Sequence, residues 1–99
     1  INTSPNFRVV VAGDLNDTPW SDTVRTLTAS TLSDMGTTIP KNERYSYILD
    51  GNAVQMDYIL INNAVDNGDQ FMIPHTNSIF DHTLQSSDHD PVFALIEIE

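Results

Sequence analysis

Two short segments of the chain carry side chains that can transfer protons and hold a cation. In the first, Asp14 and Asn16 follow directly after the apolar run 9–12, and in the second, Asp88 and His89 precede another apolar run. A carboxylate orients water or binds a hard cation, a carboxamide donates hydrogen bonds, and an imidazole transfers protons. This combination suits hydrolysis of a phosphate ester, in which a cation offsets charge on the phosphoryl oxygens.

A third acid, Asp57, lies inside the apolar segment 54–61. A carboxylate in a half-buried strand requires solvent or a partner, because burying an unpaired charge is costly. We expect His89 to be that partner, and the pairing would raise the pKa of the imidazole by charge attraction.

Each segment also has a purely structural interpretation. Asp14, Asn16 and Asp17 are typical turn formers and helix caps, and His89 could simply cap the terminal strand. The conjunction with Asp57 favours the catalytic interpretation. For His75 and Asn77 a binding role and a surface loop both stay open, and His82 is assigned to a surface loop.

The apolar patterns predict the elements that must position these groups. A strand at 7–12 is expected to be buried on both faces, because it contains four consecutive apolar residues bounded by a glycine. Ligand groups collect beyond the carboxyl ends of such strands in open α/β sheets, which is where Asp14 to Asp17 follow. A helix is expected from Trp20 to about Ser30, capped by Asp17 or Thr18. Residues 32–39 are expected to be irregular, with a turn at Gly36. A β-hairpin is expected with arms at 45–49 and 54–61 around the reversal 50–53, and further strands are expected at 71–74 and 92–98.

Together these elements predict an α/β (α+β) unit with one mixed sheet and one main helix layer. Such an arrangement leaves the other face of the sheet uncovered, so something must pack on it. The 99 residues make at most one domain, and the early start of the first strand indicates a chain cut inside a larger protein.

Composition excludes several functions. No apolar run approaches the roughly 18 residues of a membrane helix, and without cysteine the chain has neither disulfides nor thiolate chemistry. The formal net charge is −10, because 14 acidic residues face only 4 basic ones, so no basic patch can attract a polyanion. Pro19 stands where an EF-hand needs glycine, and neither a phosphate-binding glycine loop nor a zinc-binding helix motif occurs.

Three motifs, in order, resemble the endonuclease/exonuclease/phosphatase superfamily, whose fold is that of pancreatic deoxyribonuclease. They are Gly13-Asp14-Leu15-Asn16-Asp17, Met56-Asp57-Tyr58-Ile59-Leu60 and Ser87-Asp88-His89-Asp90-Pro91-Val92. Further segments are similar to the large secreted bacterial nucleases of this superfamily, namely Glu43-Arg44-Tyr45-Ser46-Tyr47, Asp50-Gly51-Asn52 and His75-x-Asn77. Tyr58 departs from these nucleases, which often have histidine there.

The resemblance implies a role for each matching residue. Asp14 would orient the attacking water, Asn16 would contact the scissile phosphate, and Asp57 would pair with His89, which holds or protonates a phosphate oxygen. Asp88 and Asp14 would bind the metal, Mg²⁺ with Mn²⁺ or Ca²⁺ as alternatives. Substrate contacts would come from His75, Asn77 and Asp90.

The resemblance also implies a four-layer α/β/β/α sandwich made of two halves, of which residues 1–99 match only the C-terminal half. The metal-binding glutamate belongs to the N-terminal half, and Glu43, Glu97 and Glu99 do not match its context. We therefore expect part of an extracellular bacterial nuclease acting on DNA or RNA, inactive alone and not membrane-bound. Its partner would be the missing half, or a second copy in a homodimer. The alternatives are a phosphatase or phosphodiesterase for small or lipid phosphates, and a non-catalytic interaction module.

Overall fold

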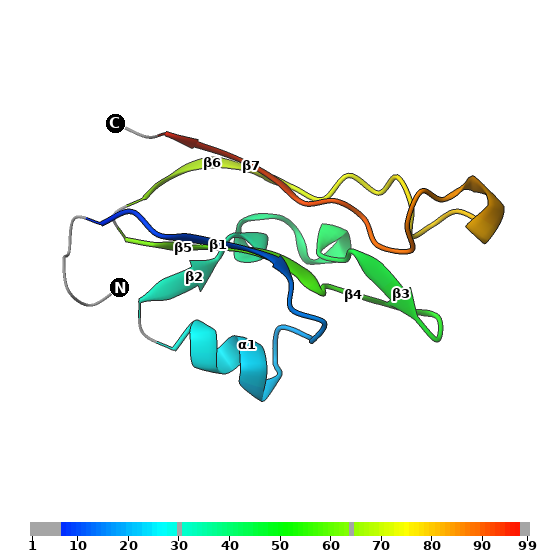
Figure 1. The fold of residues 1–99 in the computed structure, drawn as a ribbon, viewed down its shortest axis with the longest axis horizontal. Helices are drawn as coiled ribbons and strands as arrows, with labels where there is room; N and C mark the ends of the chain where they lie inside the picture. The colour runs from blue at the N-terminus through cyan, green and yellow to red at the C-terminus, as the bar shows by residue number, and fades with distance from the viewer. Residues whose placement is uncertain (1–6, 30, 64, 98–99) are drawn as a thin grey trace.

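The centre of the fold is a small antiparallel sheet. A computed structural model describes residues 7–29, 31–63 and 65–97. The strand order is β1-β5-β2, with bounds Val10–Asp14, Asp57–Asn62 and Leu32–Asp34. The helix α1 (Asp22–Leu27) lies on one face, and a ribbon of β6 (Asp66–Met72) and β7 (Phe93–Glu97) lies on the other (Figure 1).

Strand β5 organises the core because its side chains alternate between the two faces of the sheet. Tyr58 and Leu60 belong to a buried cluster with Val24 of α1. Ile59 and Ile61 belong to a second cluster with apolar residues of β6 and β7. All four of these β5 side chains are at most 8% exposed, so β5 is held from both sides. Asp57, at its first position, therefore starts from a fixed backbone.

The expectation that the strand after residue 7 is buried on both faces is wrong. Strand β1 begins at Val10 and continues through Asp14, and most of its residues are exposed. Val10 itself is 47% exposed. Within the described residues β1 lies at the edge of the sheet beside β5, and the buried cluster on the β6-β7 side contains Ile59 and Ile61 of β5 but not Val10 or Ala12 of β1.

The helix is shorter than expected, and its predicted cap is wrong. Ser21 has extended backbone angles, and its hydroxyl accepts the N–H of Val24 at 3.2 Å, so the helix begins at Asp22. The Asp17 carboxylate instead accepts the N–H of Thr18. Trp20 lies outside the helix and is 69% exposed. The indole therefore contributes little to the apolar core.

The predicted hairpin is present, but its second arm divides. Strands β3 (Tyr47–Leu49) and β4 (Asn52–Val54) pair around Asp50 and Gly51, whose φ values of 49° and 83° suit a two-residue turn of the mirror-image type. The chain then leaves this ladder, since the Ser46 hydroxyl accepts the N–H groups of Met56 and Asp57. Strand β5 consequently joins the central sheet.

The segment expected to be irregular is regular. It forms β2 and a 3₁₀ turn, η1 (Met35–Thr38), which the Asp34 carboxylate caps by accepting the N–H of Gly36 at 2.8 Å. Gly36 is needed for space, because an added Cβ would lie 2.7 Å from the Gln55 side chain. Two further 3₁₀ turns are η2 (Lys41–Glu43) and η3 (His82–Leu84).

The fold is thus a small α/β arrangement with several antiparallel sheets, not one mixed sheet. The β6-β7 ribbon, longer than the predicted strand at 71–74, covers the sheet face expected to be bare. Exposed apolar side chains lie on the outer side of this ribbon instead, with Met72, Phe93 and Leu95 at 52%, 51% and 57% exposure. None of the helices in the described ranges is long and apolar enough to cross a membrane.

Candidate active site

The site begins where β1 ends and β5 starts. Antiparallel pairing places Asp14 directly opposite Asp57 in the register of the two strands. The sequence argument placed the acids at the carboxyl ends of strands in an open α/β sheet, whereas here the end of one strand meets the beginning of its antiparallel neighbour. Two acids that are 43 positions apart in sequence are therefore adjacent on one sheet edge.

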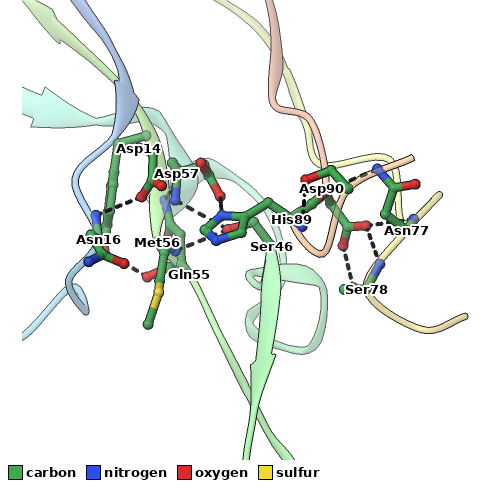
Figure 2. A network of polar contacts seen from close by, with 12 residues as sticks. Asp14, Asn16, Ser46, Gln55, Met56, Asp57, Asn77, Ser78, His89 and Asp90 are labelled. Atoms are coloured by element: carbon green, nitrogen blue, oxygen red, sulfur yellow. Dashed lines mark hydrogen bonds and ion pairs between the residues drawn. The ribbon is translucent and has the colours of Figure 1, made fainter. Parts of the chain in front are cut away.

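The structure brings Asp57 and His89 together. Asp57 Oδ2 lies 2.7 Å from His89 Nδ1, within charge-assisted hydrogen-bond range (Figure 2). The side chains are 14% and 22% exposed, so the pair is shielded but still open to solvent. The Tyr47 ring from β3 lies against the imidazole, with 4.8 Å between ring centroids. The ring is thus fixed by a carboxylate and an aromatic neighbour.

The pKa of His89 lies above its ordinary value. Burial alone would lower this pKa, but the hydrogen bond to Asp57 and the charges of Asp57, Asp14 and Asp88 outweigh burial. A higher pKa keeps more of the imidazole protonated near neutral pH. His89 is therefore suited to donating a proton or a charged hydrogen bond to an oxyanion.

Asp14 and Asn16 form an exposed polar turn beside this pair. The Asn16 N–H donates to Asp14 Oδ1 at 2.7 Å, and Asn16 has a left-handed φ of 54°, which a short polar side chain tolerates. The Leu15 N–H donates to the carbonyl of Met56, which ties the turn to the start of β5. The turn-forming interpretation is therefore correct locally, and the same turn presents Asp14 to the Asp57–His89 pair.

Tyr58 supports the turn from the opposite face of the sheet. Its hydroxyl bonds to the carbonyls of Asp17 and Gln55 at 2.7 and 2.9 Å, and the side chain is almost fully buried. Burial and nearby aspartates raise the pKa of this hydroxyl above its ordinary value. Tyr58 is thus part of the core and not of the site surface.

A hard cation fits the donor atoms on this edge. Asp14, Asp57 and His89 each offer one ligand atom, and these atoms lie within 4.8 Å of one another. Carboxylate oxygens are the ligands that Mg²⁺, Mn²⁺ and Ca²⁺ prefer. Because Asp57 and His89 are hydrogen-bonded to each other, the Asp14 carboxylate is the group most available to a cation. Asp88 is exposed and does not belong to this group, so the structure does not bring it in as a ligand beside Asp14.

Asp90, for which the resemblance implied a substrate contact, is buried and hydrogen-bonded within the protein. It is 2% exposed, and its carboxylate accepts hydrogen bonds from the Asn77 N–H and from the Ser78 N–H and hydroxyl (Figure 2). His75 Nδ1 lies 3.1 Å from the same carboxylate. Burial alone would raise the pKa of Asp90, but these bonds, led by those from Ser78, hold it below its ordinary value. Asp90 is a structural anion because each of its oxygens already has partners.

His75 and Asn77 are likewise occupied by the protein. The Asn77 side chain donates to the carbonyl of His89 at 2.9 Å and accepts the N–H of Ser86 at 3.1 Å. His75 stacks on Tyr45 at 3.8 Å, and its Nε2 is buried without a hydrogen-bond partner among the described residues. Both side chains organise the loop that carries His89, while the His82 side chain lies outside the described part of the structure.

Two site residues were missed by the sequence argument, Ser46 and Tyr47. Both lie in the segment Glu43–Tyr47, which the sequence analysis used only as evidence of similarity to secreted bacterial nucleases. The signal that could have revealed them is the pattern Tyr45-Ser46-Tyr47, two aromatic rings on either side of a small hydroxyl residue. Each ring contacts a histidine that is bonded to an aspartate.

The geometry places an Asp–His pair beside the exposed Asp14 carboxylate and Asn16. The chain matches the model of the Endonuclease/Exonuclease/phosphatase family over residues 2–89, and it belongs to this family. Members hydrolyse phosphodiesters or phosphate esters and depend on metal ions. The family assignment made from the three motifs is thus confirmed. No curated protein and no solved structure matches the chain significantly.

Proposed function

We propose that this chain supplies the acid–base side of a metal-dependent phosphodiesterase site, and that the complete enzyme is a nuclease. The observation that carries the proposal is the 2.7 Å contact between Asp57 and His89, next to Asp14 on the paired strand. A non-catalytic module would not require these groups to converge. The nuclease assignment rests on the resemblance of segments 43–47, 50–52 and 75–77 to secreted nucleases.

In this proposal the site residues act together during in-line attack of water on phosphorus. Asp14 orients the water, and Asn16 donates a hydrogen bond to the scissile phosphate. His89, held by Asp57, donates a proton or a charged hydrogen bond to a phosphate oxygen. A bound Mg²⁺, or Mn²⁺ or Ca²⁺ in its place, would supply charge neutralisation at the phosphoryl oxygens, with Asp14 as its ligand from this edge.

We further propose that residues 1–99 are the C-terminal half of a two-half sandwich, and that the chain alone is inactive. The exposed outer side of the β6-β7 ribbon, with Met72, Phe93 and Leu95, supports this, since contiguous exposed apolar side chains mark contact surfaces. Within the described residues the cation-binding group also contains no glutamate. The other half is the proposed occupant, with a homodimer as the alternative, and secretion is proposed from the resemblance alone.

The test is cleavage of plasmid DNA and of a short RNA by the chain alone and by a protein that also contains the upstream half, each with Mg²⁺ or with EDTA. We expect activity only from the longer protein with Mg²⁺. Asp14→Asn in the longer protein should lower turnover by roughly 10²-fold or more and leave the melting temperature nearly unchanged. Robust Mg²⁺-dependent cleavage by the 99-residue chain would contradict the half-domain proposal.

A phosphatase acting on small or lipid phosphates is the second candidate, and the net charge of −10 favours it because a strongly acidic protein repels a polyanion. A substrate panel on the longer protein distinguishes the two. Faster hydrolysis of DNA or RNA than of phosphomonoesters and lipid phosphates supports the nuclease, and the reverse order supports the phosphatase.

A further inference from the structure

We propose that Ser46 is a positioning residue that holds Asp57 and His89 at hydrogen-bond distance by binding the backbone beside each of them. The proposal rests on the proposed function, because it assigns Ser46 a task in the same site. Ser46 lies just before β3, is 0% exposed, and does not reach the reacting groups itself. Its effect would pass through the two residues that do.

On the Asp57 side, the contact is made by the serine hydroxyl. Ser46 Oγ accepts the N–H of Met56 at 3.0 Å and that of Asp57 at 3.2 Å (Figure 2). These amides lie where the chain leaves the β3-β4 ladder and enters β5, of which Asp57 is the first residue. A single side-chain oxygen therefore fixes the backbone from which the Asp57 carboxylate projects.

On the His89 side, the contact is made by the serine carbonyl. The Asp90 N–H donates to the carbonyl of Ser46 at 2.7 Å. The peptide group that joins His89 to Asp90 also carries the His89 carbonyl, which accepts a hydrogen bond from the Asn77 side chain at 2.9 Å. The peptide after His89 is thus held from both sides, by Ser46 and by Asn77.

Ser46 makes both sets of contacts and therefore sets the separation of Asp57 and His89. Asp57 and His89 are 32 positions apart, and their 2.7 Å contact depends on where two separate segments lie. Ser46 is itself anchored, because its N–H donates to the carbonyl of Val54 at 2.9 Å. Misplacement by about 1 Å in such a site can cost about 10²-fold in rate.

The experiment replaces the hydroxyl and reads the Asp57–His89 hydrogen bond directly. In ¹⁵N-labelled protein containing both halves, the hydrogen-bonded His89 Nδ1 proton should give a far-downfield resonance that is absent from His89→Ala. We expect Ser46→Ala to weaken or abolish this resonance, and to lower kcat by roughly 10- to 100-fold with little change in KM. Ser46→Cys, of similar volume but with a weaker acceptor, should show a smaller loss.

The matched control is Ser33→Ala. The Ser33 hydroxyl also hydrogen-bonds to the backbone of β5, donating to the carbonyl of Ile61 at 3.3 Å. Ser33 is exposed and lies away from the Asp57–His89 pair. This variant should keep the resonance and kcat.

A folded Ser46→Ala protein with an unchanged resonance and unchanged kcat would overturn the proposal. So would failure of both Ser46 variants to fold while Ser33→Ala folds, because Ser46 would then serve folding only. If the resonance responds as expected in a protein that cleaves no phosphate ester, the proposed function fails and the positioning role stands.

Discussion

The molecule contains two Asp–His pairs with similar local chemistry and different surroundings. In both, a carboxylate oxygen meets histidine Nδ1, at 2.7 Å for Asp57–His89 and 3.1 Å for Asp90–His75. In both, a tyrosine from the same short segment lies against the imidazole, Tyr47 in the first and Tyr45 in the second.

The difference lies in the carboxylates. The Asp90 side chain is fully buried and surrounded by donors from residues 75–78, whereas the Asp57 side chain is 14% exposed and faces the Asp14 turn. A carboxylate whose oxygens accept several hydrogen bonds from a loop stabilises that loop. A carboxylate that bonds mainly to one histidine can orient its ring and raise its pKa. The second pair therefore holds in place the loop that carries the first.

The largest effect should separate the two histidines by turnover. In the protein with both halves, His89→Ala should lower kcat by roughly 10²- to 10⁴-fold without unfolding, because it removes the proposed acid. His75→Ala should lower kcat less than tenfold and reduce stability, because it removes a bond to buried Asp90. Steady-state kinetics and thermal melting check both variants, and equal losses of turnover would erase the distinction.

The next effect should separate the two aspartates by stability. Asp90→Asn should lower the free energy of unfolding by on the order of 3 kcal/mol, because an amide cannot accept all the buried donors and presents hydrogens to some of them. Asp57→Asn should cost much less stability and most of the turnover. Urea unfolding at pH 7 measures the first change, and a loss below 1 kcal/mol for Asp90→Asn would show that its network is dispensable.

A smaller effect should distinguish the two tyrosines. Replacing either ring by leucine removes an aromatic contact of about 0.5–1.5 kcal/mol. For Tyr45→Leu we expect this loss in the free energy of unfolding, since its partner His75 is structural. For Tyr47→Leu we expect it mainly as a decrease of up to about tenfold in kcat/KM. Parallel unfolding and kinetic measurements on the two variants test the assignment.

The smallest effect is the pH dependence of stability, and its sign should differ between the pairs. The pKa of His89 is raised by folding, so its stabilisation is complete below about pH 6.5 and is lost as pH rises through the folded-state pKa. The pKa of Asp90 is lowered, so its stabilisation is present above about pH 3.9 and is lost as pH falls through the folded-state pKa. Unfolding series from pH 3 to 8 for His89→Gln and Asp90→Asn should flatten opposite ends of the stability profile.

Local signals in the sequence identified several features correctly. The Asp50-Gly51 reversal predicted a hairpin, because these residues accept positive φ. The isolated acid in an apolar strand predicted a partner for Asp57, because an unpaired buried carboxylate is unfavourable. The motifs around Asp14, Asp57 and His89 predicted the family, since their order does not depend on how the strands pair.

Other predictions failed because they depended on neighbours from distant segments. An apolar run such as Val9–Ala12 does not reveal whether its strand is central or at an edge, or which of its faces another layer covers, and most of β1 is exposed in the structure. The second arm of the hairpin divided because the Ser46 hydroxyl took the amides of Met56 and Asp57. From the sequence, Asp90 is one more polar residue of a functional motif, and only the tertiary structure shows that it is buried among donors from residues 75–78.

The sequence by itself determined which groups are available, namely the Asp14 turn, the acid Asp57 in an apolar strand and the imidazole of His89, because residue type and local spacing fix their chemistry. Only the tertiary structure decided which aspartate serves which histidine. Hydrogen bonds form within about 3 Å, and the antiparallel register of β1 with β5, together with the contacts of Ser46, brings residues from distant parts of the chain within that range.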